Sequence, residues 1–395
     1  MFKDVVVVSA VRTPVGRFGG SLKDFTSVDL AALVIREAVS RAGLDPAEVD
    51  EVVMGCVGQH GLNAFLARLA AIKAGLPIEV TAQNVNRLCS SGMQAIITAA
   101  VSIDHGDVDV AVAGGSESMS SYPYSSYGAR WGLRMGNAEF ADEIAFALAE
   151  PFSGNDVHIG KTAENIVEKY GITRERLDAY AVESQERAAK AIADGLFKEQ
   201  ILPVEIKEKK STRVFDTDEH PRLSTLEQLA ALKPFIKADG KITAGNASGI
   251  NDGAAAMVMM RSDKAAEKNL PVLARVVDYA VAGVEPSLMG IGPVASTNKL
   301  LKRTGFKLSD FGLVELNEAF AAQTIACIDE LGLDYATTNV NGSGISLGHP
   351  IGATGAIIST KLFYEMKRRN VKYGLATLCI GGGQGMSIIY ENPEA

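Results

Sequence analysis

One cysteine of the chain has a position that suits a nucleophile. Cys89 lies in the segment "NVNRLCSSGMQA", where a turn-rich stretch from Asn86 to Ser91 precedes an alanine-rich run that is helical in pattern from Gly92 onward. We therefore expect the thiol at a helix N-terminus, where unpaired N–H groups and the helix dipole favour the thiolate and lower the pKa of the cysteine. The alternative is a buried structural thiol.

His349 is the candidate base for this thiol. It is one of five histidines and lies in the glycine-rich segment "GSGISLGHPIGATGA", in which Pro350 fixes the chain directly after the imidazole. The tripeptide Asn-Val-Asn occurs at residues 84–86 and again at 339–341, so the two segments are duplicates of each other. Pseudo-symmetric halves packed face to face would bring Cys89 and His349 together as a nucleophile and its base. The alternative is a histidine with structural hydrogen bonds only.

Two further residues could take part in acid and base chemistry. Cys379 ends an expected strand and enters "GGGQG", whose exposed N–H groups suit a developing oxyanion, and its thiol could pass a proton. The alternative there is a tight strand-to-helix turn. Asn317, in "ELNEAFAAQ", is either the N-cap of a helix or the holder of a catalytic water.

Two other patterns do not support a site. The sequence "GISLG" fits the serine-hydrolase elbow with Ser346 as nucleophile, but a loop precedes it, a proline follows it, and no histidine occurs after His349. Cys56 and His60 offer two zinc ligands and no visible others. We therefore expect neither a serine nucleophile nor a metal site.

Internal repetition organises the chain. Short β-branched runs alternate with helical stretches, which predicts an α/β fold. Three matched pairs of segments occur in the same order in two parts of the chain, which indicates a duplication. The segments are "GLDPAEVDEVVMG" with "GFKLSDFGLVELN", "AQNVNRLCSSGMQAIITAAV" with "TTNVNGSGISLGHPIGATGAIIST", and "AVAGGSESMS" with "CIGGGQGMS". We predict an N-terminal half of residues 1–120 plus 246–270, an inserted loop domain of 121–245, and a C-terminal half of 271–395.

Composition narrows the class of protein. The net charge of −8 and the pI near 5.3 argue against a nucleic-acid or anionic-membrane partner, although a phosphorylated ligand could still be met locally. The apolar stretch at the N-terminus is too short for a signal peptide. The four cysteines have no metal-type spacing and are expected to be reduced. These features predict a cytoplasmic protein.

The motifs taken together closely resemble the thiolase family over essentially the whole chain. They are "NRLCSSGMQA", "GGSESMS", "TAGNASGINDGAAA", "ELNEAFAAQ", "NVNGSGISLGHPIGATGA" and "CIGGGQG". The resemblance implies duplicated mixed-sheet halves in a layered αβαβα core. It also implies that Cys89 takes the acyl group as a thioester, that His349 activates it, and that His349 and a water on Asn317 form one oxyanion hole. Cys379 would be the second acid or base, and the N–H groups of Cys89 and Gly381 would form the second oxyanion hole.

The resemblance also nominates the residues that meet coenzyme A and the acyl group. They are Arg222, Ser224, Thr225, Ser248, His158, Met289 and Phe320. Arg222 as a plain surface arginine is the competing interpretation. Coenzyme A would be a substrate, no cofactor would be needed, and the subunits would form a homodimer or homotetramer.

The expected activity is acyl transfer between an acyl group and acetyl-CoA through acyl-Cys89, with short chains favoured. One alternative is a broad-range degradative 3-ketoacyl-CoA thiolase of fatty-acid β-oxidation. Two others are a synthase of the same superfamily and a catalytically silent scaffold that binds acyl-CoA. The intact set of Cys89, His349, Asn317 and Cys379 weakens the scaffold interpretation, because binding alone would not require it.

Overall fold

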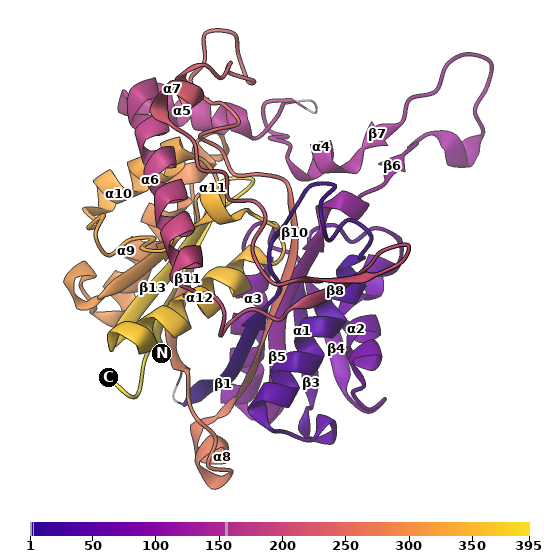
Figure 1. The fold of residues 1–395 in the computed structure, drawn as a ribbon, viewed down its shortest axis with the longest axis vertical. Helices are drawn as coiled ribbons and strands as arrows, with labels where there is room; N and C mark the ends of the chain where they lie inside the picture. The colour runs from indigo at the N-terminus through magenta and orange to yellow at the C-terminus, as the bar shows by residue number, and fades with distance from the viewer. Residues whose placement is uncertain (1, 3, 155–156) are drawn as a thin grey trace.

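The computed structural model describes residues 2, 4–154 and 157–395 (Figure 1). Within this part of the chain one ten-stranded mixed sheet dominates the fold. Its strands are β1 (Val5–Arg12), β2 (Gly16–Arg17), β3 (Glu51–Gly55), β4 (Thr81–Val85), β5 (Val110–Ser118), β10 (Asn251–Arg261), β11 (Ala274–Gly283), β12 (Leu313–Leu316), β13 (Tyr373–Ile380) and β14 (Gln384–Glu391). Two small hairpins pair β6 (Tyr124–Ser125) with β7 (Ala141–Asp142) and β8 (Val204–Lys207) with β9 (Thr212–Phe215).

The helices alternate with these strands along the chain. They are α1 (Ser27–Ala42), α2 (Leu66–Ala74), α3 (Ser91–His105), α4 (Glu143–Ala147), α5 (Gly160–Tyr170), α6 (Arg174–Ala193), α7 (Leu226–Ala230), α8 (Ser262–Glu267), α9 (Gly292–Thr304), α10 (Ala321–Leu331), α11 (Gly344–Leu347) and α12 (Thr354–Arg369). Local signals set their ends. For example, Thr26 and Asp29 form a capping box at the start of α1, and Gly43 ends it in the left-handed conformation.

The two halves of the sheet have the same topology. In the first half β3 pairs in parallel with β4 and β5, and the antiparallel order β5, β10, β1 follows. In the second half β12 pairs in parallel with Thr338 and with β13, and the antiparallel order β13, β14, β11 follows. The halves join where Val6 and Val7 of β1 pair with Arg275 and Ala274 of β11. This repeated pairing confirms the predicted duplicated halves and mixed α/β class.

Helices cover both faces of the sheet and give the predicted five layers. Along β1, Val6 and Val8 belong to a core with α1 and α2, whereas Val5 and Val7 face α3 and α12. The core around α3 and α12 also contains side chains of β13 and β14, so these two helices lie between the halves of the sheet (Figure 1). A third core joins the outer face of the second half to α9 and α10.

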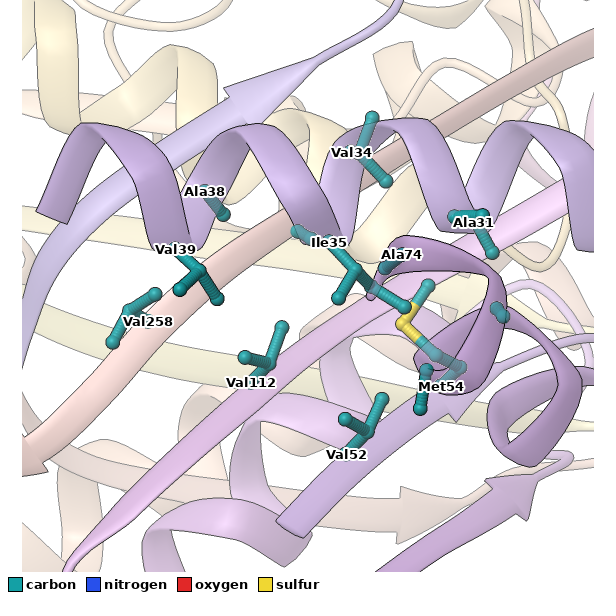
Figure 2. Close-up of a cluster of buried hydrophobic side chains, with 14 of the residues drawn as sticks. Ala31, Val34, Ile35, Ala38, Val39, Val52, Met54, Ala74, Val112 and Val258 are labelled. Atoms are coloured by element: carbon teal, nitrogen blue, oxygen red, sulfur yellow. The ribbon is translucent and has the colours of Figure 1, made fainter. Parts of the chain in front are cut away.

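The outer core shows why α1 lies where it does. Its apolar residues recur at helical spacing, and Ile35 and Val39 point toward Val112 of β5 and Val258 of β10 (Figure 2). These side chains are almost fully buried. Burying such a side chain contributes roughly 1.5–3 kcal/mol, so this face holds α1 against the first half of the sheet.

Residues between the two halves of the duplication form helices α4 to α7 and both small hairpins. A buried ion pair ties this segment to β1: Nη1 of Arg12 lies 2.7 Å from Oδ1 of Asp218, and Nη2 lies 2.9 Å from Oδ2. Nε of Arg12 also donates to Gln200. The segment of β6 and β7 extends away from the body of the molecule (Figure 1). The predicted boundaries at residues 120, 245 and 270 stay a prediction.

No helix among the described residues is long and apolar enough to cross a membrane. The same residues contain no group of three or more histidine, cysteine or acidic side chains that could hold a metal ion.

Removing the cation of the buried pair should destabilise the fold strongly. In the Arg12→Met variant Asp218 would keep a buried charge with no cation beside it, which costs about 3–5 kcal/mol. Urea unfolding followed by circular dichroism would measure the loss. Arg261→Met is the matched control, because Arg261 pairs with Asp263 at the surface and its loss should leave the unfolding midpoint unchanged. Equal unfolding midpoints for the two variants would contradict the claim that the buried ion pair of Arg12 and Asp218 stabilises the fold.

Candidate active site

A cavity of about 820 Å³ opens where the two halves and the inserted segment meet. Eight of the twelve predicted site residues line it: Cys89, His349, Cys379, Gly381, Ser248, His158, Met289 and Phe320. Most of the remaining lining is apolar, with side chains such as Leu88, Phe146, Leu148 and Phe235. The chemistry-bearing groups therefore converge on one largely apolar pocket, as is typical of a ligand site.

The close approach of α3 and α12 brings the two duplicated segments together. Gly92 in α3 and Gly355 in α12 have no side chains at the contact. A Cβ at Gly92 would lie 2.9 Å from the backbone nitrogen of Ala356, and one at Gly355 would lie 2.4 Å from that of Met93. Cys89 lies one residue before Ser90, the N-cap of α3, and a short loop separates His349 from α12, so both reach the same cavity.

Cys89 lies at a strained entry to α3. Leu88 before it has a φ of 46°, which a non-glycine residue rarely adopts. Local hydrogen bonds hold this turn: the N–H of Leu88 donates to Asn86 at 2.9 Å, and the hydroxyl of Ser91 donates to the Leu88 carbonyl at 2.7 Å. The predicted position at a helix N-terminus is confirmed.

The same surroundings overturn the predicted pKa of Cys89. Protein atoms surround the thiol, apart from its exposure toward the cavity, and this burial raises its pKa to about 11. The N–H groups of Gly381 and of Cys89 itself lower the pKa but do not outweigh burial. The prediction of a thiolate stabilised by the helix end was wrong, because it left out the desolvation that the surrounding chain imposes.

His349 is held at three atoms. Its backbone N–H donates to Oδ1 of Asn251 at 2.9 Å, its ring Nδ1 lies 2.6 Å from the hydroxyl of Thr354, and its ring Nε2 lies 3.5 Å from Nδ2 of Asn317. Burial lowers the pKa of His349 to about 4. The imidazole is therefore neutral at pH 7 and can accept a proton from the neutral thiol of Cys89.

Asn317 is not a helix cap. It follows β12, its N–H donates to the carbonyl of Thr377 at 3.0 Å, and α10 begins only at Ala321 with Phe320 as its N-cap. The N-cap alternative was therefore wrong. Oδ1 of Asn317 is buried and has no hydrogen-bond partner. Such an atom needs a partner from a water or a ligand.

Cys379 lies at the end of β13, and "GGGQG" after it turns the chain into β14. The turn joins two strands, so the alternative of a strand-to-helix turn was wrong. Burial raises the pKa of Cys379 well above its usual range, and the nearby Cys89 raises it further. Burial thus favours the neutral form of both thiols.

Comparisons with known proteins identify the family of the chain. The model of the thiolase N-terminal domain matches residues 5–263, and that of the thiolase C-terminal domain matches residues 270–392. The chain belongs to the thiolase family.

Three relatives illustrate the similarity. A beta-ketothiolase, BktB, of Cupriavidus necator is 51% identical, with 99% of this chain and 100% of the relative covered. The crystal structure of the Bacillus anthracis acetyl-CoA acetyltransferase has a TM-score of 0.97 and 50% identity, covering 99% of both chains. Human mitochondrial 3-ketoacyl-CoA thiolase in complex with CoA has a TM-score of 0.95 and 41% identity, covering 99% of this chain and 98% of that one.

Four of the residues nominated from the thiolase resemblance as ligand contacts lie in the cavity wall. Met289 and Phe320 are buried there, and Ser248 donates its N–H to Ala319 at 2.9 Å. His158 stacks edge to face against Phe235, and burial lowers its pKa. Met289 and Phe320 thus belong to the apolar lining of the cavity that also contains the two thiols.

The other three nominated residues lie outside the cavity. The side chain of Arg222 is exposed, and the hydroxyl of Ser224 donates to the Arg222 carbonyl at 3.2 Å. Thr225 is the N-cap of α7, where it forms a capping box with Gln228. The structure does not bring these three residues to the thiols, and their contact with coenzyme A stays a prediction.

Ser346 and Cys56 have structural partners. Ser346 is buried and its hydroxyl accepts from Ser184 at 2.8 Å. The thiol of Cys56 lies 3.6 Å from Oε1 of Glu117. Neither side chain lines the cavity.

Sequence reasoning missed Glu117, a fully buried carboxylate at the end of β5. It accepts N–H groups of Val57 and Gly58 from one half and of Gly352 from the other, at 2.9, 3.1 and 2.9 Å. Glu117 therefore holds the loop after His349 against the first half. A charged residue at the end of the apolar strand "AVAGGSES" was the available signal.

Alkylation of Cys89 should show the high pKa of its thiol. Because only the thiolate reacts, and burial raises the pKa to about 11, the rate of modification by iodoacetamide should keep rising with pH above 9. Mass spectrometry of the Cys89 peptide after short exposures would measure this rate. Cys327, which is fully buried outside the cavity, is the internal control and should stay unmodified. A plateau of the Cys89 rate by about pH 8 would contradict this account.

Proposed function

We propose that this thiolase transfers acyl groups between coenzyme A thioesters through an acyl-Cys89 intermediate. It would condense two acetyl-CoA into acetoacetyl-CoA and, in reverse, cleave 3-oxoacyl-CoA with CoA. The observation that carries the proposal is that Cys89, His349, Cys379 and Gly381 line one cavity. Coenzyme A is a substrate in this proposal, and no cofactor or metal is needed.

The first half of the reaction moves the acyl group onto the enzyme. Nε2 of His349 would take the proton of Cys89 as the sulfur attacks the thioester carbonyl, and in synthesis it would pass this proton to the departing CoA sulfur. Burial favours the uncharged forms of both groups before the attack. The N–H groups of Cys89 and Gly381, which both act on the Cys89 sulfur, would also stabilise the oxyanion of the tetrahedral intermediate. Asn317 does not line the cavity, but its amide lies next to His349, and its unpaired Oδ1 would hold a water.

The other half makes or breaks the carbon–carbon bond, and it is the second step of synthesis and the first step of thiolysis. In synthesis, the thiolate form of Cys379 would take a proton from the methyl group of acetyl-CoA, and the carbanion would attack the acyl carbon. The carbon–sulfur bond to Cys89 would break, and the Cys89 thiolate would recover the proton from Cys379. In thiolysis, Cys379 would return that proton to the leaving enolate of acetyl-CoA. The position of both thiols in the wall of one cavity supports this arrangement.

The proposal favours short acyl chains over the broad-range degradative alternative. The support is that the relatives at about 50% identity are named acetyl-CoA acetyltransferase and beta-ketothiolase, whereas the human 3-ketoacyl-CoA thiolase is 41% identical. The synthase alternative has less support, because Cys379 and the turn after it match the thiolase pattern.

We further infer a homodimer or homotetramer that works in the cytoplasm. The edge strand β4 is largely uncovered. The segment before it in the chain exposes three large apolar side chains, those of Leu62, Phe65 and Ile78. Both features support pairing of subunits. Trp131 and Met135, exposed in the segment between β6 and β7, would serve a second contact. The four free cysteines support a reducing compartment.

Two substitutions separate the roles of the two thiols. Cys379→Ala should lower the rate of thiolysis of acetoacetyl-CoA about 10²- to 10⁴-fold, as expected for the loss of an acid or base. The exchange of the acetyl group between acetyl-CoA and labelled CoA should continue. Exchange needs only the acylation of Cys89. Absorbance of acetoacetyl-CoA and radiolabel transfer would measure the two rates.

Cys89→Ala is the matched control for this test and should lose both reactions. Continued thiolysis by Cys89→Ala would overturn the proposed function. Loss of exchange together with thiolysis in a folded Cys379→Ala variant would overturn the division of labour between the thiols.

A further inference from the structure

Thr354 contacts the ring of His349 on the side away from Asn317. It is the first residue of α12, is buried, and does not line the cavity. Its hydroxyl oxygen lies 2.6 Å from Nδ1 of His349 and 2.9 Å from the carbonyl oxygen of Pro350. Both distances are those of hydrogen bonds.

Counting protons leaves two assignments of these bonds. A hydroxyl carries one proton, so Thr354 donates either to the Pro350 carbonyl oxygen, which also accepts the N–H groups of Ala353 and Thr354, or to Nδ1 of His349. Donation to Pro350 requires an N–H at Nδ1 of His349 that donates to the Thr354 oxygen. In the opposite assignment, the oxygens of Thr354 and Pro350 would face each other at 2.9 Å with no proton between them.

The contact at the other nitrogen agrees with this assignment. Nδ2 of Asn317 lies 3.5 Å from Nε2 of His349, and an amide nitrogen can only donate. A proton on Nε2 would place two donors against each other. With the proton on Nδ1, Nε2 has a lone pair that accepts this long contact from Asn317 and can take the proton of a nucleophile.

We propose that Thr354 is a positioning residue that keeps His349 in its Nδ1–H tautomer, so that Nε2 is the base for Cys89. The proposal rests on the proposed function. In Ser-His-Asp triads a carboxylate has this orienting role and also stabilises the charged imidazolium. A neutral hydroxyl fixes the tautomer without stabilising the positive charge, which favours quick return of the proton from His349.

Replacing Thr354 by valine tests the proposal, because valine keeps the shape of the side chain and removes the hydroxyl. The Nδ1–H group would be left buried without an acceptor, and the tautomer with a free Nε2 would lose its stabilisation. We expect kcat for thiolysis of acetoacetyl-CoA to fall about 10- to 100-fold, while KM changes less than about twofold. Thr354→Ser, which restores the hydroxyl, should recover most of kcat.

Thr360→Val is the matched control. Thr360 lies on the same helix, is equally buried, and its hydroxyl donates to the carbonyl four residues earlier, Ala356, at 2.9 Å. Thr360 therefore makes the same kind of hydrogen bond to a backbone carbonyl as Thr354. The kcat of the Thr360→Val enzyme should stay close to that of the wild type. Should Thr354→Val fail to fold, Thr354→Ala removes the same hydroxyl and should show the same loss.

Three results would overturn the role of Thr354: an unchanged kcat in a folded Thr354→Val or Thr354→Ala variant, a serine variant as slow as the valine one, or an equal loss in Thr360→Val. Cys89→Ala, assayed alongside, separates this failure from failure of the proposed function. Turnover by Cys89→Ala would remove the basis of both proposals, whereas an inactive Cys89→Ala with a fully active Thr354→Val would overturn the tautomer proposal alone.

Discussion

The contact between α3 and α12 is the constraint on which the site depends. A side chain at Gly92 or Gly355 would strike backbone atoms of the other helix, so the two helices meet as closely as bare backbone allows. Each helix belongs to one half of the duplicated sheet, and each is preceded by one reactive residue. The contact therefore places one residue from each duplicated segment, a thiol and an imidazole, at the same cavity.

Burial then determines the chemistry that this pair can do. The surrounding chain raises the pKa of Cys89 to about 11 and lowers that of His349 to about 4, so both are uncharged at pH 7. Burial therefore disfavours a preformed ion pair of these two groups and favours transfer of the proton as the sulfur attacks. When the imidazole is uncharged, its hydrogen bonds decide which ring nitrogen can accept a proton. The groups that contact the ring, Asn317 and Thr354, therefore matter through the direction of their hydrogen bonds rather than through charge.

Much of this arrangement could be predicted from the sequence, because repetition is visible in it. The matched segments around Asn-Val-Asn predicted that Cys89 and His349 would share one site, and the repeated strand order of the two halves explains why both line the same cavity. The pKa of Cys89 could not be predicted from its segment, because desolvation comes from residues far along the chain. For the same reason Glu117 escaped notice, since its partners lie about 60 and 235 residues away. The sequence also could not predict that Ser224 and Thr225 lie outside the cavity, because their positions depend on how the inserted segment folds.

Direct observation of the acyl-enzyme would test the central claim that Cys89 carries the acyl group and His349 activates it. The enzyme would be mixed with acetoacetyl-CoA in the absence of free CoA, quenched in acid and digested, and the acetyl group mapped by mass spectrometry. We predict an acetyl group on the peptide that contains Cys89, and almost none in a folded His349→Asn variant quenched at the same time. Turnover with an unmodified Cys89 peptide, or an acetyl group on another residue, would contradict the account.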